Sequence, residues 1–173
     1  MPCKWEAGLA EYVHKLRANA WVSEAGEEEV EGYFALTPQA QFHAGPETLL
    51  ERLNSSDRVI PFHLQQNDGV LLLNRLEIQW VIPAKSVPTE LVCPQTYQVT
   101  REERVRLRLL SGDTVEGLLR MELPEYFNRA SDFLNSPEHF FPLVTERGVV
   151  LVNKLCVSST RLYEASPEPV TDP

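Results

Sequence analysis

The histidines and cysteines of this chain are its most chemically versatile side chains, and their spacing matches no common catalytic or metal-binding motif. The histidines are His14, His43, His63 and His139, and the cysteines are Cys3, Cys93 and Cys156. None of them forms the His-x-His, His-Glu-x-x-His or Cys-x-x-Cys pairs that bind zinc or exchange thiols. Nucleophile, phosphate-loop and dinucleotide motifs are missing as well. We therefore predict that the protein is not an enzyme and that it uses no cofactor or metal ion.

A run of acids surrounds one short glycine-containing turn. It consists of Glu24, Glu27, Glu28, Glu29 and Glu31. A cation site made from these carboxylates would need further oxygen ligands from other loops. Such a run is more typical of a solvated hairpin tip, and we interpret it in that way.

Four arginines form a basic stripe on this acidic chain, namely Arg101, Arg104, Arg106 and Arg108. From Arg104 to Leu110 basic and apolar residues alternate, which in a strand places the arginines on one face. Charged strand faces often serve solubility, but this face also complements the acidic turn. We take the stripe as a candidate interaction surface, toward the other half of the chain or toward a neighbouring chain.

Two polar pairs follow the most apolar segments of the chain, 70–73 and 149–152, which we expect to be buried strands because each is an apolar run bounded by a turn. The pairs are Asn74-Arg75 and Asn153-Lys154. In one interpretation the four side chains form a polar binding rim. In the other, which we favour, each asparagine bonds to nearby backbone at a turn or bulge.

These pairs belong to an internal duplication. Val30-Glu31-Gly32 recurs as Val115-Glu116-Gly117, Leu53-Asn54-Ser55 as Leu134-Asn135-Ser136, Pro61 as Pro142, and Leu73-Asn74-Arg75-Leu76 as Val152-Asn153-Lys154-Leu155. A unit of about 80 residues can close a core of its own, whereas the shorter repeats of solenoid proteins cannot. The duplication therefore predicts two tandem domains.

Each copy contains turn signals between short apolar or alternating segments. The expected strands are 21–22, 30–36, 59–64, 70–73 and 76–80 in the first copy, and 104–110, 114–121, 140–144, 149–152 and 155–159 in the second. A short helical turn precedes the third strand of each copy, beginning near Pro46 or Ser131 and ending at Asn54 or Asn135. This pattern predicts a mainly β protein of two tandem small antiparallel β-barrels.

The predicted organisation has five parts. They are an N-terminal helix (1–19), a first barrel (20–82), a proline-rich linker (83–98), a second barrel (99–164) and a disordered tail (165–173). The helix is expected because apolar residues from Trp5 to Leu16 recur at intervals of three and four. It would cover an open edge of the first barrel or act as an arm that binds a partner.

The formal net charge of −9 argues against nucleic acids and anionic membranes as partners, because the summed field repels both. No apolar run approaches the roughly 18 residues that a membrane span needs. An odd number of widely spaced cysteines fits a reducing compartment. We therefore expect a cytoplasmic protein.

Parts of the second copy resemble the Sm and Hfq families of small β-barrels. The segment Val105-Arg-Leu-Arg-Leu-Leu-Ser-Gly-Asp-Thr-Val-Glu-Gly117 is similar to the opening strand, turn and second strand of those families, and Lys154-Leu-Cys-Val-Ser-Ser159 is similar to their closing strand. The resemblance implies RNA binding, but Asp132-Phe-Leu-Asn135 departs from the spacing of the family's RNA site. Its Leu-Asn-Ser ending also resembles an uncharacterised bacterial domain family with an Asp-x-Leu-Asn signature, which implies no activity.

Taken together, these features predict a non-enzymatic adaptor or regulatory protein-interaction module. Its partner is another protein or a second copy of the chain. The alternative is a divergent Sm-like RNA-binding protein that uses the arginine stripe and the duplicated asparagines.

Overall fold

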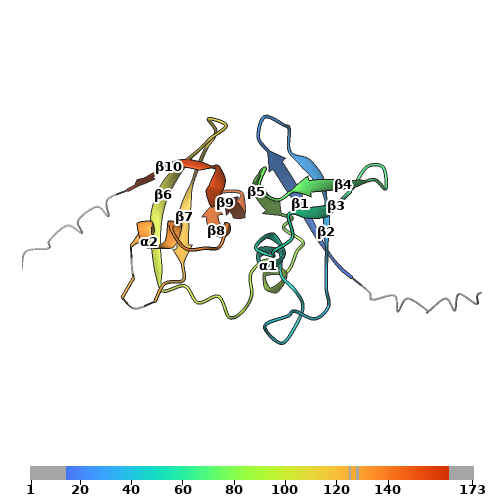
Figure 1. Ribbon diagram of the computed structural model, residues 1–173, viewed down its shortest axis with the longest axis horizontal. Coiled ribbons are helices and arrows are strands. Elements are labelled where there is room, and N and C mark those ends of the chain that lie inside the picture. Colours follow the sequence, from blue (N-terminus) through green and yellow to red (C-terminus); the bar gives the residue numbers. More distant parts are fainter. Residues whose placement is uncertain (1–14, 125, 128, 164–173) are drawn as a thin grey trace, which may run out of the picture.

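The computed structural model describes residues 15–124, 126–127 and 129–163, and it confirms that the protein is mainly β (Figure 1). Ten strands pair antiparallel in one sheet, accompanied by two short α-helices. The strands are β1 (Leu16–Glu24), β2 (Val30–Leu36), β3 (Val59–Leu64), β4 (Val70–Asn74), β5 (Ile78–Pro83), β6 (Arg101–Leu109), β7 (Thr114–Met121), β8 (Phe140–Thr145), β9 (Gly148–Asn153) and β10 (Val157–Leu162). The helices are α1 (Leu49–Leu53) and α2 (Ala130–Leu134), and single 3-10 turns lie at η1 (Thr89–Leu91) and η2 (Lys154–Cys156).

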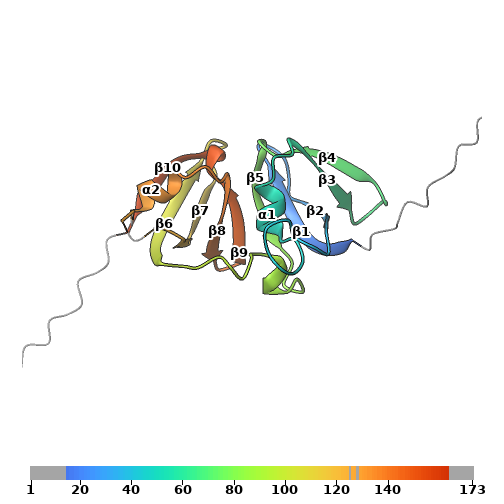
Figure 2. The same cartoon turned by 60° about the horizontal axis from the view of Figure 1, so that its bottom comes forward.

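The strand order is β10-β6-β7-β8-β9-β5-β1-β2-β3-β4. We call β1 to β5 with α1 the first half and β6 to β10 with α2 the second half. The strands of each half stay adjacent, β5 pairs with β9 in the middle, and β4 and β10 lie at opposite ends of the sheet (Figures 1 and 2). The sheet is therefore open and continuous, in place of the two closed barrels expected from the sequence.

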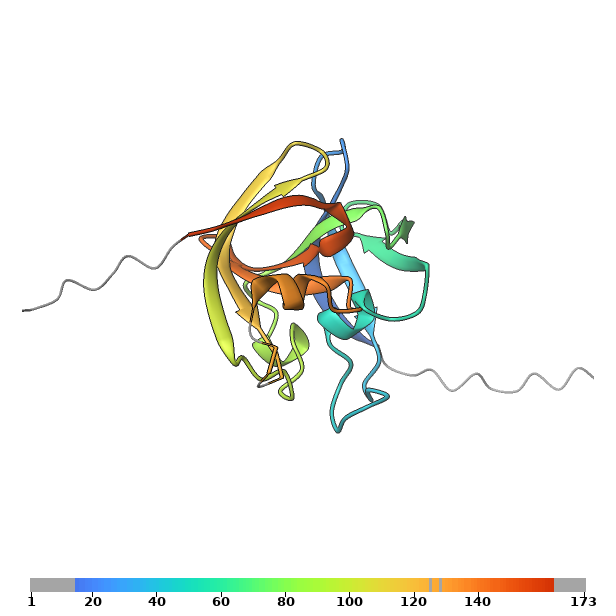
Figure 3. The same ribbon diagram turned by 60° about the vertical axis from the view of Figure 1, so that its left-hand side comes forward.

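Corresponding residues of the two halves pair in the same register. In the first half Tyr33 lies opposite His63, and at the matching place in the second half Leu118 lies opposite Val144. In the same way, Val59 lies opposite Asn74 and Phe140 lies opposite Asn153. The pairing of β5 with β1 and of β10 with β6 is interrupted by an irregularity at the same position. A side chain at the repeated glycine, Gly32 or Gly117, would collide with a backbone carbonyl of the next strand. Figure 3 shows how strongly the strands of the second half bend.

The core forms where alternating strand residues point inward. In β6, Val105, Leu107 and Leu109 are buried while the arginines between them are exposed, as the alternation predicts. Two buried clusters result, and each contains residues from both halves. Phe140 and Leu151 of the second half belong to the cluster of the first half, and Ile82 of the first half belongs to the other.

The helical turns form near the expected places, with different caps. The helix α1 begins after Thr48, so Pro46 lies outside its first turn. Thr48 caps α1: its hydroxyl accepts from the Glu51 backbone N–H while the Glu51 carboxylate accepts from the Thr48 backbone N–H. In the second half Arg129 holds the capping position and Ser131 lies inside α2. Asn54 and Asn135 end the helices as expected, with φ of −93° and −90°, so neither adopts the left-handed conformation that often ends a helix.

The two prolines inside strands lie in β3 and β8, neither of which is an edge strand. Pro61 in β3 and Pro142 in β8 face a stretch where the preceding strand has already diverged, because pairing with β2 or β7 is confined to the later residues of each strand. The missing N–H therefore costs no ladder hydrogen bond.

The predicted N-terminal helix falls mostly on residues 1–14 and the predicted tail on 165–173, which lie outside the described residues. At Leu16 the chain is already in β1, so the segment 16–19 is strand and not helix. Between β5 and β6 the chain forms η1, and Val92 after it is buried in the core of the first half. None of the helices in the described ranges is long and apolar enough to cross a membrane.

Candidate functional site

The junction between the halves is built from strands that are largely buried on both faces. Trp80 lies opposite Val152 and Val81 opposite Leu151. Phe140 and Leu151 project from β8 and β9 into the core of the first half and are 1% and 0% exposed. Because a strand buried on both faces needs a continuous apolar run, residues 80–82 and 149–152 suit this place.

Asn54 joins the halves through hydrogen bonds to backbone. Its Nδ2 donates to the Phe140 carbonyl at 3.0 Å, and its Oδ1 accepts from the Phe140 N–H at 2.8 Å. Both backbone polar groups of Phe140, at the start of β8, are thereby satisfied by one side chain. The asparagine expected only to end a helix therefore also positions the second half.

The four residues of the candidate polar rim all contact backbone, and Asn153 is fully buried. Asn153 Nδ2 donates to the Ile78 carbonyl at 2.8 Å across the junction, and its Oδ1 accepts from its own half, from the Leu155 N–H. Asn74 Oδ1 accepts from the Leu76 N–H at 3.3 Å and bonds to no other strand. The same residue type thus makes an inter-half contact in β9 and only a local contact in β4.

The two bases of that group hold the ends of the helices. Arg75 donates to the Leu53 and Asp57 carbonyls, and its Nη1 lies 2.9 Å from His139 Nδ1 across the junction. Lys154 Nζ donates to the Phe133 carbonyl at 2.8 Å and to Ser136. Burial lowers the pKa of Lys154 to about 8. The last carbonyls of a helix have no hydrogen-bond donor within the helix, and Arg75 and Lys154 supply donors at the ends of α1 and α2.

The acidic turn does meet an arginine, but not one of the stripe. Glu29 accepts from both Nη atoms of Arg147 at 2.8 Å and from Trp80 Nε1 at 3.1 Å. The Arg147 guanidinium keeps the pKa of Glu29 below its usual value. Arg147 comes from the turn between β8 and β9, so this pair closes the junction at its rim.

The arginine stripe lies on β6, separated from the first half by three strands of the sheet. Arg106 pairs with Glu116 on β7, and Arg104 lies 4.0 Å from the same carboxylate and above the Tyr163 ring. Arg101 pairs with Glu103 and, by the alternation along β6, lies on the face opposite the other three arginines, so it is not part of one stripe with them. Arg108 is exposed and its side chain forms no ion pair within the described part of the chain. The stripe is therefore partly neutralised by its own half.

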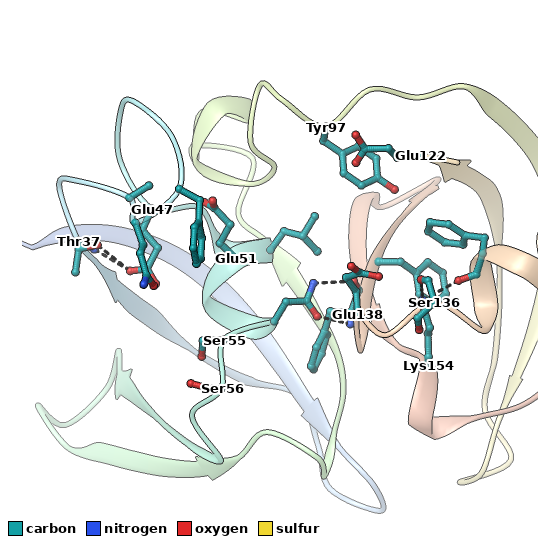
Figure 4. A pocket seen from close by; sticks show the side chains of 18 of the residues that line it. Thr37, Glu47, Glu51, Ser55, Ser56, Tyr97, Glu122, Ser136, Glu138 and Lys154 are labelled. Atoms are coloured by element: carbon teal, nitrogen blue, oxygen red, sulfur yellow. Dashed lines mark hydrogen bonds between the residues drawn. The ribbon is translucent and has the colours of Figure 1, made fainter. Parts of the chain in front are cut away.

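A groove of about 1030 Å³ opens beside the junction and is lined by both halves (Figure 4). Its charged lining residues are Glu47, Glu51, Glu122, Glu138 and Lys154. Several of these carboxylates have partners, since Glu47 accepts from Thr37 and Glu51 accepts from Thr48. The excess of glutamates gives the groove a negative potential, which disfavours phosphate groups.

The described histidines contact other side chains, and the described cysteines have raised pKa values. His43 lies 2.8 Å from Glu51, His63 stacks on Tyr33, and His139 contacts Arg75. Burial raises the pKa of Cys93 to about 11 and also raises that of Cys156, so neither thiol is poised as a thiolate. No group of three or more potential metal ligands occurs among the residues that the structure describes.

The outer strand β4 exposes a row of apolar side chains. Val59, Val70 and Leu72 on the β3–β4 ribbon are 48%, 51% and 67% exposed. The sequence predicted that the run at 70–73 is buried, and for the outward face this is wrong. The matching run in β9 is buried because β5 covers it, whereas no strand within the described residues covers β4.

Sequence reasoning missed both this exposed edge and the contact of Asn54 with β8. The available signal was the asymmetry of the final strands, since Ile78–Pro83 is far more apolar than Val157–Leu162. Comparisons with protein-family models, with curated proteins and with solved structures found no match for the chain.

Proposed function

We propose that this protein is a non-enzymatic protein-interaction module, and that its free edge strand β4 binds an added β-strand. The observation that carries the proposal is the exposure of Leu72 and Val70 on a strand with unpaired backbone groups. Edge strands normally carry charges, prolines or bulges that prevent pairing. The segment Val70–Asn74 has none of these, and its pairing with β3 is regular.

Strand addition suits this edge in chemical terms. Backbone hydrogen bonds supply affinity, and alternate side chains supply specificity. A partner strand that covered Val70 and Leu72 would remove from water the largest exposed apolar side chains of the ribbon. A role without catalysis is supported by the contact of His139 with Arg75 and by the raised pKa values of the Cys93 and Cys156 thiols.

RNA binding has less support. The duplicated asparagines that the alternative requires are engaged with backbone, and Asn153 is fully buried. Arg106 of the stripe is paired with Glu116. The groove between the halves carries an excess of glutamates.

Binding of a strand peptide tests the proposal. A fluorescent peptide with the sequence of residues 76–83 contains β5, which covers the matching strand β9 inside the chain. We expect saturable binding to dilute protein, weakened at least about tenfold by Leu72→Lys, because a lysine replaces buried apolar surface. Phe42→Lys, which removes an 85% exposed side chain away from β4, is the matched control. Equal binding by all three proteins, or none, would contradict strand addition at β4.

A further inference from the structure

The two strands at the ends of the sheet correspond to the two strands that pair with each other at the junction. At the junction the fifth strand of the first half, β5, pairs with the fourth strand of the second half, β9. The fourth strand of the first half, β4, and the fifth strand of the second half, β10, remain at the ends. Each end therefore presents one member of a strand pair that the chain already forms once.

We propose that β10 of one chain pairs antiparallel with β4 of another copy, as β5 pairs with β9 inside the chain. This inference rests on the proposed function, since it names the strand that β4 accepts. The register follows from the matching positions of the two halves. It places Ser159 opposite Leu73 and Thr160 opposite Leu72 of the neighbouring copy.

The exposed residues of the β3–β4 ribbon match those that the junction buries. Phe140 is 1% exposed, whereas Val59 at the matching place is 48% exposed. Leu151 is 0% exposed, whereas Leu72 is 67% exposed. The difference arises because β5 and α1 of the first half cover Phe140 and Leu151. A second chain would cover Val59 and Leu72 in the same way.

The opposite end of the sheet offers the complementary surface. Leu53 of α1 and Ile78 of β5 are 0% exposed under β8 and β9. Their counterparts, Leu134 of α2 and Val157 of β10, are only half-buried. On the proposed register Leu162 of β10, which is 51% exposed, lies opposite Val70 of the next copy. Two apolar side chains now in water would face each other.

The hydrogen bonds of the junction can also be repeated between chains. Asn135 ends α2 as Asn54 ends α1, but its side chain makes no hydrogen bond within the described part of the chain. In the proposed pair Asn135 would bond to the backbone of Val59, as Asn54 bonds to Phe140. Asn74 would likewise donate to the Val157 carbonyl, as Asn153 donates to that of Ile78.

The strand pair must form between chains because β4 and β10 lie at opposite ends of the sheet (Figure 1). Such a contact joins different surfaces of two identical chains and is head-to-tail. Head-to-tail contacts give closed rings or open filaments, according to the rotation between neighbours. A single discrete mass above the monomer indicates a ring, and a ladder of masses indicates an open chain.

Sedimentation of the full chain tests the pairing. We expect the wild type to be larger than a monomer, and Leu72→Lys and Asn135→Ala each to weaken association about tenfold or more, because they remove apolar contact or backbone bonds. Phe42→Lys should associate like the wild type. A wild type that is monomeric at all concentrations overturns the proposal, and continued binding of the strand peptide would then leave the proposed function standing.

A complementation experiment separates head-to-tail pairing from a symmetric β4–β4 dimer. Leu72→Lys blocks the β4 end, and Leu162→Lys blocks the β10 end. Each variant alone should be mainly monomeric, whereas their mixture should give a heterodimer through the one intact β10 and the one intact β4. A dimer formed by Leu162→Lys alone would show that β4 pairs with itself and would overturn the head-to-tail assignment.

Discussion

At the residue scale, the duplicated asparagines show how one residue type serves two purposes. Asn54 and Asn153 bond across the junction. Asn135 and Asn74 occupy the matching positions at the ends of the sheet, and their side chains bond to no other strand among the residues that the structure describes. Their types and positions were visible in the sequence as helix ends and turns. Their partners were not, because the bonded backbone lies in the other half of the chain.

Replacing Asn54 with alanine should lower the free energy of unfolding by about 1–3 kcal/mol, because it leaves the N–H and carbonyl of Phe140 without their partner. Asn135→Ala is the matched control, since it changes the same helix-ending position. Its effect on the dilute monomer should stay within about 0.5 kcal/mol. Urea unfolding measures both. Equal losses would mean that the helix end, and not the junction, needs the asparagine.

His139 gives the junction a pH dependence. Burial lowers the pKa of His139 below its ordinary value of 6.5, and the charges of Arg75 and Lys154 lower it further. Between the lowered pKa and 6.5 the unfolded chain therefore binds more protons than the folded chain, so stability falls as the pH drops through this window.

His139→Gln should remove this contribution and flatten the decline of stability with falling pH. Urea unfolding of the two proteins from about pH 7.5 to about pH 5 measures the difference, and carboxylates common to both cancel in the comparison. Parallel curves for variant and wild type would show that His139 does not titrate differently in the folded chain.

At the element scale, much of the strand pattern was readable. Alternation predicted the strand β6 and its buried face correctly, and the turn signals predicted β2 at 30–36. The start of β1 was wrong, because it begins at Leu16 inside the expected helix and not at Trp21. The sequence could not predict that β5 and β9 pair, since an apolar run indicates burial without naming its neighbour. For the same reason the run in β4 was expected to be buried although its outward face is exposed.

Three arginines of the stripe, Arg104, Arg106 and Arg108, act together because they lie on one face of β6. Reversing the charge of Arg104, Arg106 and Arg108 should destabilise the second half at low salt, since Glu116 would then face like charges. Thermal unfolding should show a deficit that shrinks in about 1 M salt. Adding Glu116→Arg should restore part of the loss. An unchanged midpoint at low salt would show that the stripe makes no net contribution.

At the scale of the whole molecule, the chain is one open sheet whose halves are joined by strand pairing and by shared cores. The sequence indicated the duplication but implied two separate barrels, because a repeat does not reveal how its copies meet. An open sheet leaves two ends, and these ends match the two sides of the junction. The proposed assembly would therefore follow from how the two copies are joined.

Hydrogen exchange of the unmodified protein shows whether β4 and β10 pair between chains. Amides of β5 and β9 should be protected at every concentration, because they pair within the chain. Amides of β4 and β10 should gain protection together as the concentration rises, since the same contact covers both strands. Protection of both edges that does not depend on concentration, or protection of β4 without β10, would contradict head-to-tail assembly.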